Sequence, residues 1–241
     1  MPLFYPHGFS GLTPGVPTVR FNGSTGLARF DMGVPDSPNF GFSVWVKFNG
    51  GDGTTQQIYM CRRDSIIGWD LWRAINNALG FELRSTNGTL LASFGFGSIT
   101  VASGWTHILG VHLSGIGHQW FINGNLEVSI PASSTPFDSL GASWFLGAES
   151  EFDFLFNGDM ADFRFWQGNV PNFLNSSIRQ QVIRNGRPVR PTPNGAVGGI
   201  QPIVYLTAKS RQFNVNLGSI AANGDFGVFG TLSYLEDNGL N

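Results

Sequence analysis

Hydrophobic and polar residues alternate along most of the chain from residue 18 onward. A two-residue period places every second side chain on one face of a strand, so each run predicts a β-strand with one buried face. Gly, Asn, Asp or Pro separates the runs, as is typical of an all-β sandwich or barrel. The predicted strands cover residues 18–22, 26–31, 42–48, 56–61, 67–73, 79–84, 89–94, 105–113, 117–122, 125–130, 143–147 and 160–166, with further short strands around 203–207, 212–217 and 226–234.

Two local patterns predict how the strands are joined. Asn123 and Gly124 stand between two alternating runs, and Asn-Gly favours a tight hairpin because both residues tolerate positive φ. Leu174, Ile178 and Val182 recur every four residues, which predicts one short helix near 174–185 that Gly186 can close. The Pro-rich residues that follow have no period and predict a linker or extended arm.

Composition narrows the classes of partner. Charged residues make up 12% of the chain and the net charge is −2, without a basic run, so we expect no nucleic-acid partner. The single cysteine, Cys61, excludes an internal disulfide. The N-terminal residues lack the pattern of a secretory signal, and no apolar run approaches the length of a membrane helix, so we expect a soluble product without membrane insertion.

Several motifs resemble those of laminin G-like domains of the concanavalin A-like lectin and glucanase group. The resemblance covers roughly residues 18–184 and implies a two-sheet antiparallel jelly-roll sandwich. It predicts an N-terminal arm at 1–17, a jelly-roll domain at 18–186, and a linker with a C-terminal β-rich extension at 187–241. The matching residues are Trp105 and His107 in one strand, Phe121, Asn123 and Gly124 at a hairpin, and Gly158, Asp162, Phe163 and Arg164 in a late strand.

The C-terminal segment shows a narrower resemblance. The patterns at Pro202–Leu206, Phe213–Gly218 and Gly224–Leu232 are similar to the ending of jelly-roll structural proteins of tailed bacteriophages. This resemblance implies a non-enzymatic virion protein, in a head decoration, fibre or tail, assembled in the host cytoplasm. Its partners would be other virion proteins, further copies of itself and host glycans. The alternatives are a free lectin-like carbohydrate-binding module and a glycoside hydrolase.

Acidic residues between 149 and 159 offer two kinds of chemistry. Glu149, Glu151 and Asp153 alternate as in the catalytic strand of laminarinase-like hydrolases, but the aspartate stands last instead of in the middle. Calcium is the better use for these hard oxygen atoms. The candidate ligands of a calcium ion are therefore Glu149, Glu151, Asp153 and Asp159, while the leading interpretation of this stretch is a solvated acidic loop.

Tryptophans offer a surface for sugars. Trp69 and Trp72 have opposite parity on one strand, so they cannot both face inward unless the strand is bulged. Aromatic rings stack on sugar rings, and neighbouring polar groups bind hydroxyls, although most aromatic residues here must fill the core. The candidate glycan-binding residues are Trp69, Asp70, Trp72, Arg73 and Asn76.

Histidine and cysteine give weaker candidates. His107 and His112 differ in parity and should face opposite sides of one strand, which argues against a three-histidine zinc site with His118. Cys61 has no flanking signature of a catalytic thiol and is interpreted as a small buried side chain.

Overall fold

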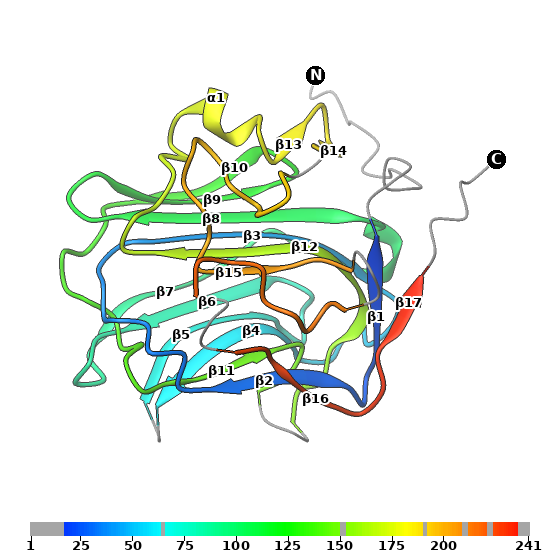
Figure 1. The fold of residues 1–241 in the computed structure, drawn as a ribbon. Helices are drawn as coiled ribbons and strands as arrows, with labels where there is room; N and C mark the ends of the chain where they lie inside the picture. Colours follow the sequence, from blue (N-terminus) through cyan, green and yellow to red (C-terminus); the bar gives the residue numbers. More distant parts are fainter. Residues whose placement is uncertain are drawn as a thin grey trace.

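The protein is a sandwich of two antiparallel β-sheets packed face to face (Figure 1). The computed structural model describes residues 17–63, 66–149, 153–189, 192–208, 212–220 and 224–235. The predicted jelly-roll fold class is therefore confirmed. Residues 1–16 of the predicted N-terminal arm lie outside the described residues.

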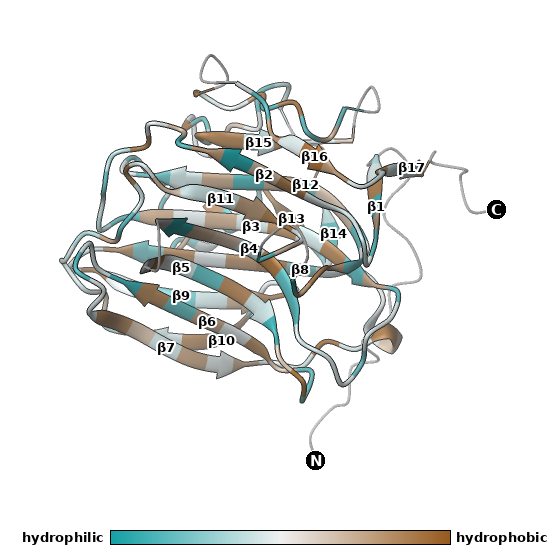
Figure 2. Ribbon diagram, turned by 90° about the horizontal axis from the view of Figure 1, so that it is seen from below, coloured by the Kyte–Doolittle hydropathy of each residue, from teal (hydrophilic) through white to brown (hydrophobic). Residues whose placement is uncertain are grey.

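Sheet A forms one layer and sheet B the other. In spatial order, sheet A holds β10 (Asn125–Ile130), β9 (Gly117–Ile122), β8 (Thr106–Leu113), β3 (Phe40–Phe48), β12 (Asn157–Gln167), β1 (Thr18–Asn22) and β17 (Ser233–Leu235), with β15 (Val204–Leu206) also paired to β12. Sheet B holds β16 (Gly227–Phe229), β2 (Gly26–Phe30), β11 (Ser143–Leu146), β4 (Gln56–Arg63), β5 (Ile66–Arg73), β6 (Leu79–Arg84) and β7 (Leu90–Phe96). The edge strands β10 and β7 lie at one side of the sandwich, and β17 and β16 lie at the other (Figure 2).

The core between the sheets is largely aromatic. Trp69 stacks on Phe165 with ring centroids 5.1 Å apart, and Tyr59 meets Phe163 edge to face at 4.5 Å. Hydropathy alternates along the strands of sheet B in Figure 2, as expected when one face is buried and the other is not. Aromatic rings thus provide much of the hydrophobic burial in a chain with few charges.

Two Asn-Gly pairs close hairpins. Asn123 and Gly124 have φ values of 52° and 84° and join β9 to β10, so the predicted hairpin is confirmed. Asn185 and Gly186, with φ values of 53° and 72°, join β13 (Ile183–Arg184) to β14 (Arg187–Pro188). Gly186 was predicted to close the helix. With Asn185 it instead forms the same Asn-Gly turn that was predicted at Asn123 and Gly124.

The predicted helix is present but much shorter than residues 174–185. Among the described residues, α1 (Ser176–Arg179) is the one α-helix, and the Asn175 side chain caps it by accepting a hydrogen bond from the Ser177 amide at 3.0 Å. Turns follow it, because the chain must enter the β13–β14 hairpin. Within the residues that the structure describes, no helix is long and apolar enough to cross a membrane.

The described C-terminal residues pack on the same sandwich. β15 pairs with β12, β16 with β2, and β17 with β1, so both sheets gain strands from this segment. Two expectations here are wrong in detail. Residues 212–217 form turns instead of a strand, and the strand expected at 226–234 is split into β16 and β17 around Gly230, whose φ is 80°.

The outer face of sheet A is covered by the chain after β12. Trp166 packs edge to face on Phe173 at 5.2 Å, and its indole N–H donates to the Ile200 carbonyl at 3.2 Å. A second apolar cluster is thereby buried outside the main core, formed by Trp45, Leu109, Val111, Phe121, Ala161, Trp166, Val170, Phe173, Val182, Ile183 and Val197. The outer face of sheet A therefore packs against the protein's own chain.

Candidate functional site on the outer face of sheet B

The two tryptophans of β5 face opposite sides of sheet B, as their parity indicated. Trp69 is 0% exposed and lies in the core against Phe40 and Phe165. Trp72 lies on the outer face and is partly exposed. Trp69 is therefore not placed to contact a ligand, whereas Trp72 is, and the glycan-binding set predicted from the sequence must lose one of its two aromatic rings.

Trp72 lies flat across the neighbouring strand. It pairs with Gly80 of β6, and a Cβ atom added to Gly80 would overlap the indole ring. Gly80 in turn pairs with Gly95 of β7, where a Cβ would meet nothing closer than 3.7 Å. A partly exposed indole and a side-chain-free strip therefore lie together on this face.

Asp70 lies two residues before Trp72 on β5, so its side chain is on the same face of the sheet. Its side chain accepts a hydrogen bond from the Gln57 amide nitrogen, which also donates to the carbonyls of Tyr59 and Leu71 at 3.1 and 3.0 Å. Glu82 of β6 is directly opposite Asp70. Burial, with the charges of Glu149 and Glu82 adding to it, raises the pKa of Asp70 to about 7 against the effect of the Gln57 hydrogen bond. This carboxyl group therefore changes charge near neutral pH.

Glu82 is held in place from the same strand. The Arg84 Nε–H donates to the Glu82 carboxylate at 2.5 Å, and Arg84 also donates to the Gly88 carbonyl at 3.0 Å. The indole of Trp72, the two carboxyls and Ser93, opposite Glu82 on β7, form one polar surface with an aromatic plate. We call this surface the Trp72 face.

Arg73 has a structural role instead of the predicted contact with a ligand. Its side chain is 0% exposed, and its guanidinium donates to the carbonyls of Gly50 at 3.0 Å and Ile99 at 3.3 Å. It also pairs with Asp52 at 2.8 Å and lies 4.0 Å from the ring centre of Phe48. Burial lowers the pKa of Arg73, with Asp52 opposing the shift.

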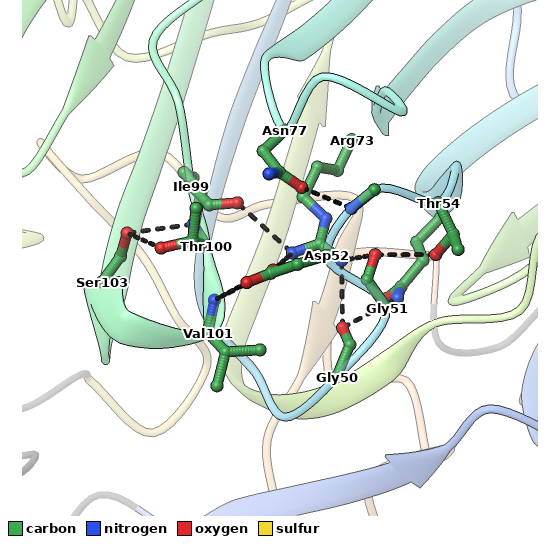
Figure 3. Close-up of polar contacts among 12 residues, drawn as sticks. Gly50, Gly51, Asp52, Thr54, Arg73, Asn77, Ile99, Thr100, Val101 and Ser103 are labelled. Atoms are coloured by element: carbon green, nitrogen blue, oxygen red, sulfur yellow. Dashed lines mark hydrogen bonds and ion pairs between the residues drawn. The ribbon is translucent and has the colours of Figure 1, made fainter.

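Three loops meet around Arg73 at one end of the sandwich (Figure 3). Asp52 accepts the Val101 amide at 3.1 Å, and the Asn77 side chain accepts the Gly53 amide at 3.0 Å. Asn76 is exposed at the tip, and its side chain accepts the Ala78 amide at 3.1 Å. Asn76 follows Trp72 by four residues in the sequence. It lies on the loop between β5 and β6, one of the loops that meet around Arg73.

The three predicted calcium ligands that the structure describes, Glu149, Asp153 and Asp159, do not form a group that could hold a metal ion. Asp159 is buried in sheet A and accepts two hydrogen bonds from Arg20, at 2.7 and 3.1 Å. Glu149 lies 3.9 Å from Arg62, Asp153 is exposed, and Glu151 lies outside the described residues. Within the described ranges, no group of three His, Cys, Asp or Glu side chains could hold a metal ion.

The acidic stretch also lacks the geometry of a catalytic strand. β11 ends at Leu146 and β12 begins at Asn157, so Glu149 and Asp153 lie on a connecting loop. The Glu149 amide donates to the Asp153 carbonyl at 3.1 Å. The two described carboxylates of the pattern that resembled a hydrolase strand are therefore not on a strand.

The histidines and the cysteine are structural. His107 bonds to Ser43 at 2.9 Å on the outer side of sheet A, whereas the rings of His112 and His118 lie 4.8 Å apart within the sandwich. Cys61 is buried and its thiol donates to the Asp138 carbonyl at 3.3 Å. The predicted separation of His107 from His112 is thus confirmed.

The sequence did not indicate Glu82 and Ser93 of the Trp72 face, nor Gln57 and Gly80, which lie against Asp70 and Trp72. Each lies on a strand that was predicted, but its position relative to Trp72 and Asp70 depends on how neighbouring strands are paired. The pairing of Gln57 also follows a register shift between Gln57 and Tyr59. Alternation along one strand carries no such information.

Known proteins share this architecture. A heptameric pentraxin of Limulus polyphemus, described as SAP-like, matches 81% of this chain and 94% of its own with 16% identity and a TM-score of 0.53. A Bacteroides ovatus protein provisionally assigned to carbohydrate binding matches 92% of this chain and 60% of its own, with 12% identity and a TM-score of 0.61. At these identities the likeness concerns the fold. No curated protein sequence matches the chain significantly.

The sequence also matches a family model, a laminin G domain model described as the concanavalin A-like lectin/glucanases superfamily. The match runs over residues 22–171, which include β2 to β12 and the whole Trp72 face. It spans more than half of the 241 residues. The chain therefore belongs to the concanavalin A-like lectin and glucanase superfamily.

Proposed function

We propose that the protein is a carbohydrate-binding module whose ligand lies on the Trp72 face. The observation that carries this proposal is the indole of Trp72, partly exposed and laid flat over Gly80, with Asp70 and Glu82 beside it. A flat aromatic plate next to fixed hydrogen-bonding groups suits a ligand with one apolar face and a rim of hydroxyls. Sugars have that character.

The polar groups on this face are already oriented. Gln57 is fixed by two carbonyls and holds Asp70, and Arg84 holds Glu82. Preorganised acceptors lower the entropy lost on binding. Carboxylates that accept hydrogen bonds from hydroxyl groups favour a neutral sugar, because they would repel the negative charge of an acidic sugar. The fold shared with the Bacteroides ovatus protein supports this proposal.

Glycoside hydrolysis is a second candidate, favoured by one observation. Asp70 and Glu82 face each other on adjacent strands, and opposed side chains in a sheet have Cβ atoms roughly 5 Å apart. Retaining glycosidases use two carboxyl groups at about that spacing. Binding is preferred because Arg84 pairs with Glu82 at 2.5 Å, which stabilises that carboxylate and weakens it as a nucleophile.

A glycan array probed with the labelled full chain tests the binding proposal. We expect saturable binding to a set of neutral oligosaccharides, and about a tenfold loss of affinity or more in Trp72→Ala. Gly80→Ala should give a similar loss, because the added methyl group displaces the indole. Its matched control is Gly227→Ala, the same change at an exposed glycine of β16 at the far edge of sheet B, where the added Cβ would meet nothing closer than 3.5 Å.

The outcome separates the two candidates. Binding without turnover supports the module, whereas release of reducing sugar that is lost in Asp70→Asn and in Glu82→Gln would establish the hydrolase. Wild-type protein that binds no sugar on the array, or binding that is equal in Trp72→Ala, would contradict the proposal. Repeating the assay with EDTA tests for the calcium ion considered in the sequence.

We further propose that the module serves in a phage particle, as a head, fibre or tail component. The support for this role is the residue pattern of the C-terminal segment, from Pro202 to Leu232. Density-purified particles from the source of the sequence should contain the chain in stoichiometric amount by mass spectrometry. Recovery of the chain in the particle-free supernatant alone would contradict this role.

A further inference from the structure

Asn-Gly pairs recur along this chain. The sequence contains nine of them, and the structure describes both residues of seven. An asparagine before glycine can cyclise, because glycine has no Cβ atom to hinder attack by its amide nitrogen on the preceding side chain. The reaction needs a side chain that can rotate and an amide nitrogen that is not already hydrogen-bonded. The seven described pairs begin at Asn22, Asn49, Asn87, Asn123, Asn157, Asn185 and Asn194.

Four of these pairs are restrained through the asparagine side chain. The Asn123 side-chain oxygen accepts the His107 amide at 2.8 Å, at the tip of the β9–β10 hairpin. The side-chain oxygens of Asn87 and Asn194 each accept two hydrogen bonds, and the amides of the glycines that follow them donate to carbonyls at 2.8 and 3.0 Å. The side-chain oxygen of Asn22 accepts three hydrogen bonds. These side chains are not free to rotate.

Two further pairs are restrained through the backbone. Asn157 lies in β12 and is paired with β1. The Asn49 amide donates to the Asn157 carbonyl at 3.0 Å, and the Gly50 carbonyl accepts hydrogen bonds from Gln56 and Arg73, both at 3.0 Å. The peptide groups around Asn49 are thus fixed in the loops that meet around Arg73.

Asn185 differs from the other six. Within the described residues its exposed side chain makes no hydrogen bond, and the Gly186 amide makes none either. The β13–β14 ladder behind the turn has two residue pairs, and one contains Pro188, which has no N–H to donate. The β9–β10 ladder behind Asn123 has five. The turn at Asn185 therefore opens locally at a lower free-energy cost.

Two arginines flank this turn. Arg184 and Arg187 are exposed and directly opposite each other, an arrangement that is destabilising for like charges. In the described part of the chain, neither arginine forms an ion pair. Their charges stabilise negative charge that develops at the turn, both on the reacting amide groups and on a carboxylate product. The local electrostatic field therefore favours conversion of Asn185 to an acid.

We propose that Asn185 is a site of spontaneous deamidation and backbone isomerisation. The Gly186 amide nitrogen attacks the side-chain carbonyl carbon of Asn185 and gives its proton to water. The bond from that carbon to the side-chain nitrogen breaks, and ammonia leaves a five-membered succinimide. Water then opens the ring at either carbonyl carbon, which yields aspartate or isoaspartate. The modified chain carries one more negative charge, placed between the two arginines.

Isoaspartate at this position should loosen the cover on the outer face of sheet A. It adds a methylene group to the backbone of a two-residue turn that depends on φ values of 53° at Asn185 and 72° at Gly186. Val182 and Ile183, just before the turn, are buried in the apolar cluster that includes Trp166. We therefore expect hydrogen-exchange protection to fall around residues 180–189 in the modified chain, with sugar binding at the Trp72 face unchanged.

Timed incubation of the full chain at slightly alkaline pH tests the proposal. Peptide mapping by mass spectrometry follows each pair as a gain of about 1 Da, and an isoaspartyl methyltransferase assay detects isoaspartate. Asn185 should react at least about tenfold faster than Asn123, the same turn with a bound side chain and a longer ladder. The same incubation in guanidinium chloride is the control, because every restraint is lost and the pairs should react at similar rates.

Variants test the cause. Asn185→Gln should abolish the fast isoaspartate signal, because the longer side chain closes its ring much more slowly. Asn194→Gln, the same change at an exposed position of the covering segment, should leave the signal intact. Replacing Arg184 and Arg187 together with Gln should slow the reaction several-fold.

Three results would overturn the proposal. The first is a native chain in which Asn185 remains unmodified, and the second is reaction of Asn123 at the same rate as Asn185. The third is an equal preference for Asn185 in guanidinium chloride, which would assign the reactivity to local sequence instead of the folded turn. None of these results depends on whether the Trp72 face binds a sugar.

Discussion

The outer faces of the two sheets are treated in opposite ways. The outer face of sheet A carries Trp45 and Trp166, both fully covered by the chain that follows β12. The outer face of sheet B carries Trp72, which is left partly exposed beside carboxyl groups. One sandwich thus uses the same residue type for a second core on one side and for a candidate ligand plate on the other.

The difference shows what distinguishes a structural aromatic residue from a functional one. Trp166 packs on Phe173 and satisfies its N–H with the Ile200 carbonyl, whereas Trp72 has only a glycine strip beneath it. Burial against other apolar side chains, which Trp45 and Trp166 share, is what makes such a ring a stabilising element. An exposed ring held flat by its own sheet is better explained by a ligand.

Acid should produce the largest effect, by destabilising two buried histidine sites, His107 on the covered outer face of sheet A and His118 in the core between the sheets. Burial lowers the pKa of His107 and of His118 to about 3, against 6.5 for an unperturbed histidine. The unfolded chain therefore binds more protons in this window, so these groups contribute stability above pH 6.5 that is lost as the pH falls toward 3. Denaturant titrations at a series of pH values should show the midpoint decreasing across that interval.

The acid effect has a structural reason and a control. The indole N–H of Trp120 donates to His118 at 2.7 Å, so protonation of that nitrogen would break a buried hydrogen bond. His118→Gln should reduce the slope of stability against pH while lowering stability at pH 7. A slope that is unchanged in this variant would show that other groups cause the acid sensitivity.

Trp166→Ala should be the most damaging single substitution on the covered face. Removing a fully buried tryptophan leaves a cavity and costs about 3–5 kcal/mol of unfolding free energy. Trp72→Ala is its matched control and should cost under about 1 kcal/mol, because the ring is partly exposed. Urea unfolding measures both, and equal losses would contradict the distinction between the two faces.

Arg73→Ala should destabilise the loops beside the open face by about 2–3 kcal/mol. The change removes charge-assisted hydrogen bonds to buried carbonyls of two loops and the packing on Phe48. Asp52→Asn is the milder control, because Asp52 is 43% exposed and its pair is partly solvated. Hydrogen exchange should localise the loss to residues 49–55, 74–78 and 97–105, and a uniform loss would contradict this role.

Asp70→Asn should have the smallest effect, and of opposite sign. The pKa of Asp70 is raised to about 7, so the folded state holds a proton that the unfolded state releases near pH 4. Stability contributed by this group therefore falls as pH rises from about 4 to 7. The variant should be more stable than the wild type by on the order of 1–2 kcal/mol at pH 8, with the difference shrinking toward pH 4.

Thermal unfolding at both pH values checks this prediction. A variant less stable than the wild type at pH 8 would show that the hydrogen bond from Gln57 to the ionised carboxylate outweighs its burial. The same measurement on Glu82→Gln tests the coupling, since removing the charge of Glu82 should lower the pKa of Asp70.

Much of the fold could be predicted because its signals are local. Alternation placed the strands of the sandwich, and Asn123 with Gly124 placed a hairpin, since backbone conformation at a turn depends on the residues within it. The helix near 174–185 was too long because tertiary packing draws the chain into the β13–β14 hairpin after Arg179. The spacing of apolar residues within the segment carries no information about that packing.

The candidate site was predicted only in part. The parity of Trp69 and Trp72 correctly indicated that they face opposite sides, but not which one faces solvent. Arg73 was expected to contact a ligand, yet a basic side chain beside an aromatic residue has no sequence signal that separates a buried guanidinium from an exposed one. Its burial follows from three loops that converge from distant parts of the chain.

By itself the sequence determined the all-β class, the superfamily motifs, the absence of an internal disulfide and the positions of most strands, because periodicity and turn chemistry act over a few residues. Only the tertiary structure decided which face is covered and which is open, and which tryptophan meets solvent. Those properties depend on strand pairing across tens to more than a hundred residues, such as β12 with β1 and β16 with β2. A long-range register is set by the packing of the whole sandwich.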